Sequence, residues 1–246
     1  MTAVLVHGVP ETPAVWGPLL RELQRKDVVT LQLPGFGTSV PEGWRATEEY
    51  ADWLIGELEA LGQPVDLVGH DWGGALTFRV ATTRPDLLRS WVCDVTGMFH
   101  EKFKWHDLAK IWQTPEAGEK YFEDNKALPP ETIAELYVAF GMTPDVAAEL
   151  VAAADDEMAR SILGLNRSAI QPAMAELGRD AEAATARPGL ALIAGADPFA
   201  SDNTGSIQVA ERMGATIEIL EGAGHWWMLD SPALGAAALE RFWETL

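Results

Sequence analysis

Short apolar segments, each bounded by turn-forming residues, alternate along this chain with segments of helical periodicity. Near-continuous apolarity over so few residues is typical of parallel strands that are covered on both faces. The alternation therefore predicts an α/β fold, with a doubly wound and mostly parallel sheet of about six strands flanked by helices. The predicted strands are Ala3–Val6, Val28–Leu33, Val65–Val68, Ser90–Val95, Leu190–Ala194 and Thr216–Leu220, and the predicted helices are Trp16–Gln24, Thr47–Leu61, Ala75–Arg84, Ile207–Met213 and Pro232–Leu246.

The alternation stops between residues 97 and 187. This stretch contains several helical patterns, separated by prolines at positions 115, 129, 130, 144 and 172, and no convincing strand. Proline interrupts a helix because it lacks a backbone N–H and its ring clashes with the preceding turn. We expect residues 1–96 and 188–246 to form the α/β core, and residues 97–187 to form a helical cap inserted between the fourth and fifth strands.

The chain is strongly acidic, with 18 Lys and Arg against 37 Asp and Glu and a formal net charge of −19. Such a surface argues against nucleic acid and anionic membranes as partners. The single cysteine, Cys93, excludes an intramolecular disulfide. No apolar run has the length of a membrane helix or of the apolar part of a signal peptide. We therefore expect a cytoplasmic protein, either a monomer or a homodimer.

One strand-to-helix junction carries chemistry as well as structure. The strand at Val65–Val68 runs into Gly69-His70-Asp71-Trp72-Gly73-Gly74, the pattern of a nucleophile elbow, which lifts one side chain above the sheet. Glycines are needed where backbone and helix approach too closely for a Cβ atom. The lifted residue here is Asp71. A carboxylate is already an anion at neutral pH, so it suits attack on an electrophilic carbon that carries a leaving group.

Two further polar residues follow later predicted strands. His225 comes directly after the last strand, and Asp197 comes after the strand before it. Because ligands of open α/β sheets bind at the carboxyl ends of the strands, both residues are expected near Asp71. His225 is the candidate base that takes a proton from water, and Asp197 is the candidate acid that holds the histidine tautomer. The alternatives for the acid are Asp94 and Asp202.

The loop after the first strand, His7-Gly8-Val9-Pro10, is expected at the same edge of the sheet. Its glycine lets the backbone turn towards the site. The backbone N–H groups of Val9 and Trp72 are predicted to form an oxyanion hole. We expect His7 to be a turn residue that is bonded to backbone.

These motifs resemble one family. The segments H-G-V-P (7–10), L-P-G-F-G (33–37), G-H-D-W-G-G (69–74), G-A-D-P (195–198) and G-A-G-H-W (222–226) are similar to those of the Asp-nucleophile branch of the α/β-hydrolase superfamily, which includes epoxide hydrolases and haloalkane dehalogenases. The order of nucleophile, acid and histidine along the chain is also that of α/β-hydrolases. The resemblance implies an α/β-hydrolase fold, Asp71 as nucleophile, His225 as base, Asp197 as acid and no cofactor. The N-terminal hairpin that usually precedes the H-G strand in this family is expected to be missing.

The two reactions of this branch differ in their leaving groups. An opening epoxide produces an alkoxide that needs a proton, and related epoxide hydrolases supply it from cap tyrosines, one of them often in a Tyr-Arg pair. The comparable pair here is Asn166-Arg167, so the expected tyrosine is absent. Asn166 itself becomes a candidate contact of the leaving group. Tyr137 and Tyr121 are the tyrosines of the predicted cap and the candidate proton donors.

A halide leaves as a stable anion and needs only N–H donors. Related dehalogenases use the indole N–H of a tryptophan after the nucleophile, which is Trp72 here, together with a cap tryptophan or an Asn in H-G-N-P. Val9 removes the Asn option, which leaves Trp105 or Trp112 as the second donor. Aromatic residues after the predicted base are candidates for lining the pocket, namely Trp226 and Trp227.

The sequence thus predicts a hydrolase that forms an alkyl ester on Asp71, and we favour the opening of an epoxide to a vicinal diol. Haloalkane dehalogenation is the alternative within this chemistry, and a small-molecule-binding protein without hydrolytic activity is the alternative outside it. A narrow apolar pocket under the cap would select a small lipophilic substrate. A serine esterase does not fit, because the elbow holds no serine. We expect no metal, because neither His70-Asp71 nor His100 with His106 has the spacing of metal ligands.

Overall fold

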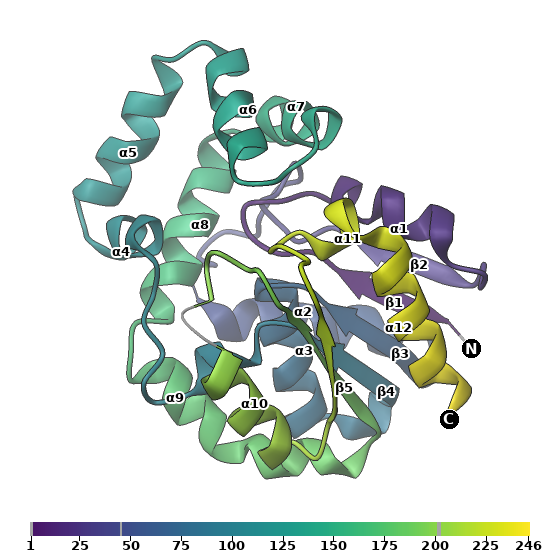
Figure 1. Ribbon diagram of the computed structural model, residues 1–246. Helices are drawn as coiled ribbons and strands as arrows, with labels where there is room; N and C mark the ends of the chain where they lie inside the picture. Colours follow the sequence, from purple (N-terminus) through teal and green to yellow (C-terminus); the bar gives the residue numbers. More distant parts are fainter. Residues whose placement is uncertain (1, 45, 201–202) are drawn as a thin grey trace.

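A single sheet of six parallel strands forms the centre of the computed structural model (Figure 1), which describes residues 2–44, 46–200 and 203–246. The strand order is β2-β1-β3-β4-β5-β6, and each neighbouring pair is parallel. The expected mostly parallel sheet of about six strands is therefore confirmed. The strands are β1 (Ala3–Val6), β2 (Val28–Leu31), β3 (Val65–Gly69), β4 (Leu88–Cys93), β5 (Gly189–Ala194) and β6 (Thr216–Leu220).

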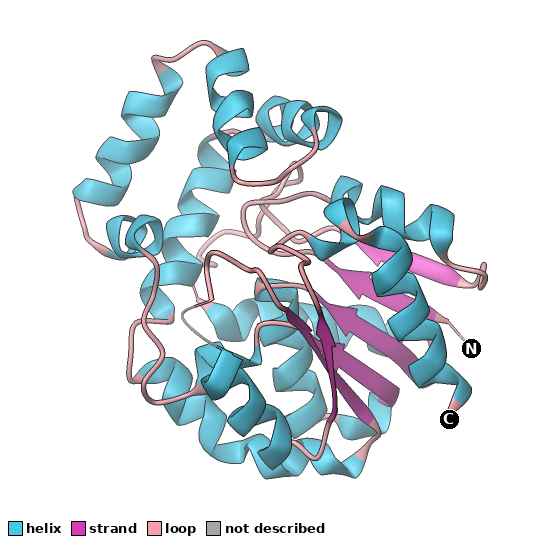
Figure 2. Ribbon diagram, in the orientation of Figure 1, coloured by secondary structure: helices cyan, strands magenta, loops and turns pink. Residues whose placement is uncertain are grey.

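Helices cover both faces of the sheet (Figure 2). α1 packs against α12 and α11 on one face, whereas α2 and α3 pack together on the other face, where α10 also lies. Because both faces are covered, the central strands β1, β3 and β5 are buried along their whole length, and the edge strands β2 and β6 are partly exposed. These helices are α1 (Gly17–Glu22), α2 (Thr47–Ala60), α3 (Trp72–Thr83), α10 (Asn203–Arg212), α11 (Trp227–Asp230) and α12 (Pro232–Glu244).

Between β4 and β5 the described chain is helical, and most of this segment lies above the carboxyl ends of the strands (Figure 1). Pro130 and Pro144 stand in the first turns of α6 and α7, where proline is tolerated because the first N–H groups of a helix have no partner within it. The segment contains α4 (Asp107–Gln113), α5 (Ala117–Lys126), α6 (Pro130–Ala139), α7 (Pro144–Ala153), α8 (Asp156–Ser168) and α9 (Ala173–Leu177). The 3-10 helices η1 (Pro13–Trp16), η2 (Pro85–Leu87), η3 (Thr96–Phe99) and η4 (Gly178–Ala186) complete the fold.

Several boundaries differ from those predicted by a few residues, and two of these differences concern the edge of the sheet where the site lies. β2 ends at Leu31 rather than at Leu33, because the Leu33 N–H donates to His7 Nε2 at 3.0 Å instead of joining the sheet. α3 begins at Trp72 rather than at Ala75, so the chain passes from β3 into the helix with a single turn residue after His70. None of the helices within the described residues is long and apolar enough to span a membrane.

Candidate active site

Asp71 occupies a strained turn between β3 and α3. Its φ of 49° and ψ of −117° lie outside the regions that residues with a side chain normally adopt. Glycine is required on both sides: a Cβ atom on Gly69 would lie 2.1 Å from the Gly73 carbonyl oxygen, and one on Gly73 would lie 2.2 Å from that of Val6. The turn thus lifts the Asp71 carboxylate above the carboxyl edge of the sheet, as an elbow does.

The Asp71 carboxylate has one oxygen held by backbone. The Val9 N–H donates to Oδ1 at 2.9 Å, whereas Oδ2 has no hydrogen-bond partner within the described residues. A Cβ atom on Gly8 would lie 2.5 Å from that of Asp71, so this loop approaches the carboxylate only because residue 8 is glycine. Burial raises the pKa of Asp71 to about 6, although the positive charges of His225 and His70 act to lower it. The group is therefore a poorly solvated anion at neutral pH.

His225 and Asp197 come together from the loops after β6 and β5. His225 Nδ1 lies 2.9 Å from Asp197 Oδ2, and the Phe199 N–H donates to Asp197 Oδ1 at 2.7 Å. Burial alone would lower the pKa of His225, but the charge of Asp197 and its hydrogen bond outweigh burial and raise that pKa. Burial would raise the pKa of Asp197, but His225 outweighs burial and lowers it. The ionised carboxylate keeps a hydrogen on Nδ1, which leaves Nε2 as the basic nitrogen.

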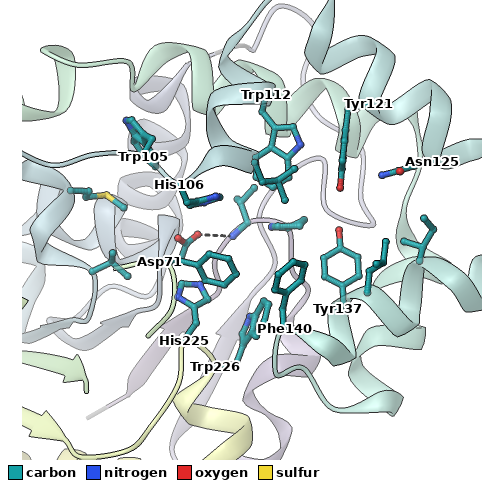
Figure 3. Close-up of a pocket in the computed structure, with 18 of the residues that line it drawn as sticks. Asp71, Trp105, His106, Trp112, Tyr121, Asn125, Tyr137, Phe140, His225 and Trp226 are labelled. Carbon is teal, nitrogen blue, oxygen red and sulfur yellow. Dashed lines mark hydrogen bonds between the residues drawn. The ribbon is translucent and has the colours of Figure 1, made fainter. Parts of the chain in front are cut away.

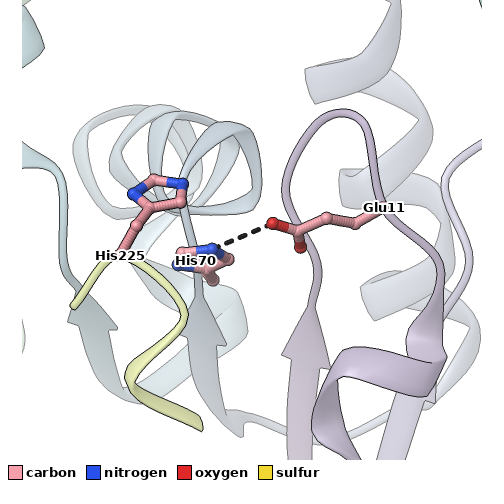
Figure 4. Close-up of side chains that lie close together, drawn as sticks. All are labelled: Glu11, His70 and His225. Carbon is pink, nitrogen blue, oxygen red and sulfur yellow. Dashed lines mark hydrogen bonds and ion pairs between the residues drawn. The ribbon is translucent and has the colours of Figure 1, made fainter. Parts of the chain in front are cut away.

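A second group of charges lies beneath the site, formed by Glu11, His70 and Asp94, which we call the buried ionic cluster. Glu11 Oε1 lies 3.0 Å from His70 Nε2 (Figure 4), and His70 Nδ1 is hydrogen bonded to Asp94 Oδ2. Burial would lower the pKa of His70, but the two carboxylates outweigh burial and raise it well above its ordinary value. Burial would raise the pKa of Glu11, but the charge of His70 lowers it to about 2. His70 is thus a buried cation between two anions.

The buried ionic cluster holds the backbone of the site in place. Asp94 Oδ1 accepts a hydrogen bond from the Asp71 N–H at 2.9 Å, and Glu11 Oε2 accepts one from the Gly8 N–H at 2.7 Å. The first bond fixes the elbow and the second fixes the loop that carries Val9. The cluster therefore connects the two backbone segments that surround the carboxylate.

Within the described residues, Glu11, His70 and His225 are residue types that can bind a metal ion, and their ligand atoms lie within 4.8 Å of one another (Figure 4). Their spacing along the chain gives no sign of this grouping, because each residue comes from a different loop. Glu11 and His70 are already paired, and the Trp226 indole N–H donates to Glu11 Oε1 at 2.7 Å. Glu11 and His70 are thus organised as an ion pair whose hydrogen bonds are already made.

A narrow cavity of about 100 Å³ lies above Asp71, between the edge of the sheet and the helical segment (Figure 3). Its walls are mostly apolar and aromatic. The core contributes Asp71, His225 and Trp226, and the helical segment contributes residues of the loop before α4 and of α4, α5 and α6. The polar side chains of Asp71, His106 and His225 thus face a small space with mostly apolar walls.

Both candidate tyrosines line this cavity. In Figure 3 the hydroxyl groups of Tyr121 and Tyr137 point towards each other, at the end of the cavity away from Asp71. Burial raises the pKa of Tyr137 well above its ordinary value, so its hydroxyl keeps its proton at neutral pH. Neither hydroxyl lies directly over the Asp71 carboxylate in this view.

The indole N–H groups do not converge on Asp71. Trp105 lines the cavity, but its N–H donates to the Ala169 carbonyl oxygen at 3.2 Å. Trp72 is buried, its ring stacks on that of Trp105 with centroids 6.2 Å apart, and it does not line the cavity. The Trp112 N–H has no partner within the described residues, but its nitrogen lies on the Tyr121 side of the ring (Figure 3).

Other sequence candidates are engaged elsewhere. The N–H of Trp226 is taken by Glu11, so only its ring faces the cavity. Trp227 does not line the cavity, because its ring is buried and its N–H donates to Asp94 at 2.8 Å. Of the alternative acids, Asp94 is bonded to His70 rather than to His225, and Asp202 lies outside the described residues.

The structure also corrects the expectation for Asn166. Its side chain is buried, does not line the cavity, and donates to the Ile162 carbonyl oxygen of its own helix at 2.9 Å. Arg167 pairs with Glu119 at 2.8 Å on the outer side. Asn166 therefore serves the packing of α8 and does not meet a leaving group.

The sequence reasoning missed three residues of the site: Glu11, Phe199 and His106. Glu11 directly follows the H-G-V-P motif, and a carboxylate next to a predicted catalytic loop was the available signal. Phe199 lies two residues after Asp197, where its backbone and its ring both serve the site. His106 lines the cavity just before α4, and no local pattern marks it.

Comparisons with known proteins agree with this architecture. The sequence pattern of the alpha/beta hydrolase family matches residues 3–238. An (E)-2-((N-methylformamido)methylene)succinate hydrolase of Acinetobacter baylyi is 35% identical over 89 residues, which cover 35% of this chain and 34% of that protein. Epoxide hydrolase 4 of Mus musculus is 34% identical over 91 residues, which cover 35% of this chain and 25% of that protein. The matches thus span about a third or less of these relatives.

Solved structures resemble the whole chain. A haloalkane dehalogenase from Bradyrhizobium elkani has a TM-score of 0.75 and 23% identity, covering 99% of this chain and 90% of that one. An E-2-(acetamidomethylene)succinate hydrolase has a TM-score of 0.73 and 17% identity, covering 99% and 91%. Identities this low show a shared fold alone. Because the family pattern extends over nearly the entire sequence, the chain belongs to the alpha/beta hydrolase family.

Proposed function

We propose that this protein is a hydrolase that works through a covalent alkyl ester on Asp71, with a small epoxide as its substrate. The observation that carries the proposal is the state of the Asp71 carboxylate. One oxygen is held by the Val9 N–H, the other has no partner within the described residues, and the group lines an apolar cavity. An anion so poorly solvated is a strong nucleophile towards carbon.

In the first step, Asp71 Oδ2 forms a bond to one epoxide carbon, and the bond from that carbon to the ring oxygen breaks. The electron pair passes to the ring oxygen, which takes a proton from the hydroxyl of Tyr137 or Tyr121. Ester formation neutralises the buried charge of Asp71, so burial favours this step. The closed apolar walls keep bulk water away from the reacting carbon.

In the second step, His225 Nε2 takes a proton from water, and the resulting hydroxide attacks Cγ of the Asp71 ester. Negative charge develops on Oδ1, which the Val9 N–H already contacts. The backbone N–H of Trp72, the first residue of α3, has no partner within its own helix and is the second donor. Asp197 stabilises the imidazolium that forms. The bond between Cγ and Oδ2 then breaks, the diol leaves with the proton of His225, and the new carboxyl group returns a proton to the tyrosinate.

Two observations support an epoxide as the substrate class. Two phenolic hydroxyls line the cavity, and the raised pKa of Tyr137 keeps its proton in place until an alkoxide forms. Part of the sequence is also similar to epoxide hydrolase 4. Haloalkane dehalogenation is the second candidate, favoured by the position of Trp72 directly after Asp71, although the Trp72 ring does not line the cavity.

Trapping the ester tests the proposal. In His225→Gln the second step lacks its base, so the ester should accumulate when the variant is mixed with a panel of small epoxides and haloalkanes. Intact mass rises by the whole mass of an epoxide, but by the mass of a haloalkane less that of its hydrogen halide. Digestion should map the adduct to Asp71. Asp71→Ala is the matched control and should gain no mass.

Absence of an adduct with every panel member would overturn the covalent mechanism and leave a binding protein as the alternative. An adduct with haloalkanes alone would overturn the epoxide assignment. The fold of each variant is checked by its circular dichroism and thermal midpoint.

A further inference from the structure

His106 is a cavity residue to which the mechanism above gives no role. It lies in the loop before α4 and forms the N-cap of that helix, where its Nδ1 accepts a hydrogen bond from the Ala109 N–H at 3.2 Å. An imidazole nitrogen that accepts a hydrogen bond carries no hydrogen. In the neutral ring the hydrogen is therefore fixed on Nε2, which becomes a donor.

The His106 ring is neutral under ordinary conditions. Burial lowers its pKa to about 4, and the charge of His225 adds to that effect. A neutral imidazole is a very weak acid at its remaining N–H, so this group donates a hydrogen bond without giving up its hydrogen. It is a fixed dipole rather than a proton source.

Aromatic neighbours hold the ring at the reacting end of the cavity. The His106 centroid lies 5.0 Å from that of Phe199 and 6.3 Å from that of Trp112. Phe199 in turn lies 4.9 Å from His225, so one ring separates the two histidines. In Figure 3 the Asp71 carboxylate lies between the His106 and His225 rings. Nε2 of His106 has no acceptor within the described residues and is available to a molecule in the cavity.

We propose that the His106 Nε2–H donates a hydrogen bond to the atom that leaves the attacked carbon while Asp71 Oδ2 bonds to that carbon. This inference rests on the proposed function and adds a catalytic residue to its first step. In an epoxide the leaving atom is the ring oxygen, which keeps the electron pair of the broken bond and takes its proton from a tyrosine. In a haloalkane it is the halide, which departs with the electron pair and needs no proton. His106 keeps its hydrogen in both cases.

The other indole N–H groups of residues that line the cavity are not available for this role. The indoles of Trp105 and Trp226 donate to protein acceptors, and that of Trp112 is turned towards Tyr121. The tyrosine hydroxyls lie at the opposite end of the cavity, so they supply the proton only after the opened oxygen has swung away from the attacked carbon. The indole N–H of Trp72 has no acceptor within the described residues either, but Trp72 does not line the cavity. Among the residues that line the cavity near Asp71, His106 is therefore the one with an N–H left to stabilise charge as it develops there.

Two substitutions separate the two hydrogen bonds of this ring. His106→Asn places an amide oxygen near the position of Nδ1, so it keeps the cap on α4 but removes the donor. His106→Gln places an amide N–H near the position of Nε2, so it keeps a donor but weakens the cap. Both are made in the His225→Gln background, and the rate of ester formation on Asp71 is followed by rapid quenching and intact mass.

We expect ester formation to slow on the order of 100-fold in His106→Asn, as when one donor of an oxyanion hole is removed, and to slow far less in His106→Gln. With haloalkanes the loss should grow from iodide to chloride, because the poorer leaving group depends more on its donor. Normal ester formation in His106→Asn would overturn the donor role while leaving the covalent mechanism intact. So would a loss confined to His106→Gln, since that pattern belongs to the cap. Absence of ester in the His225→Gln parent would overturn the covalent mechanism and this role with it.

Discussion

Asp71 combines two features that cost stability and favour reaction. Its backbone lies at a φ of 49°, which is unfavourable for any residue with a Cβ atom, and its carboxylate is removed from bulk water. Ester formation removes the buried charge, so the reaction relieves part of this cost. The contact from Val9 N–H compensates only one oxygen, and thereby leaves the other as the more reactive one.

The raised pKa of Asp71 predicts how ester formation depends on pH. The ionised form is the nucleophile and its pKa is about 6, so the rate should reach a plateau above pH 7. It should fall roughly tenfold per pH unit well below the pKa, because each unit removes nine-tenths of the remaining anion. In His225→Gln the apparent pKa should be at or above this value, because the His225 charge lowers the pKa of Asp71 in the parent.

The measurement is the rate of mass gain of His225→Gln between pH 4.5 and 8, with a substrate that has no ionisable group. Only the enzyme then titrates in this range. A rate that stays constant down to pH 5 would mean that Asp71 keeps the ordinary pKa of an aspartate, and would contradict its desolvation.

At the scale of the elements, the main catalytic candidates could be located from sequence because parallel strands have a shared carboxyl edge. Asp71, His225 and Asp197 each follow a strand whose apolar run is easily recognised, and the structure brings them to one edge of the sheet. That these three residues meet at one edge depends neither on the lengths of the connecting helices nor on the details of how those helices pack. The elbow is predictable for the same reason, since its glycines are required by local clashes.

The buried ionic cluster could not be predicted in the same way. Glu11 lies 59 positions from His70 in the chain, and their pairing depends on how two loops cross rather than on any local pattern. Only the completed fold places His70 between two carboxylates, and only that placement makes it a cation. A charged residue beside a motif indicates a role but does not identify its partner.

The cluster predicts a large effect for Glu11→Gln. Glu11→Gln removes one of the two carboxylates that compensate the buried charge of His70 and leaves only Asp94 beside it. Breaking a buried ion pair is costly, so we expect the free energy of unfolding to fall by about 3 kcal/mol near neutral pH. Turnover should fall as well, because Glu11 also holds the loop that carries Val9. Chemical denaturation measures the first effect, and steady-state rates with an active substrate measure the second.

The stability lost in Glu11→Gln should itself depend on pH. The pKa of Glu11 is about 2 in the folded protein against an ordinary 4.5, so its ionisation stabilises the fold above pH 4.5 and that contribution disappears as pH falls towards 2. Glu48→Gln is the matched control, because Glu48 pairs with Arg79 at 2.9 Å on the exposed surface and should cost less than about 1 kcal/mol. Equal losses in the two variants would contradict the role of the cluster.

At the scale of the whole molecule, the cavity belongs neither to the sheet nor to the helical segment but lies between them (Figures 1 and 3). This explains why the leaving-group contacts were the least predictable part of the site. Asn166 and Trp105 occupy plausible positions in the sequence, yet both donate to backbone within the helical segment. Which face of each helix turns towards Asp71 is decided by packing against neighbours, and no short motif encodes it.

Phe140 tests whether the contact between the helical segment and the core sets the width of the cavity, because it lies at the end of α6 and packs on a core loop. Its ring lies 5.9 Å from that of Phe199 in the core loop and lines the cavity, although half of the side chain is exposed. In Phe140→Ala the cavity opens towards solvent, so bulky substrates should gain at least about tenfold in kcat/KM relative to small ones. Competition between two substrates of different width measures this ratio.

Ile111→Ala removes a similarly exposed side chain of the helical segment that does not line the cavity, and it should leave the ratio unchanged. If both variants leave the ratio unchanged, substrate width is limited elsewhere, and the bridge between α6 and the core loop is not the wall that selects the substrate.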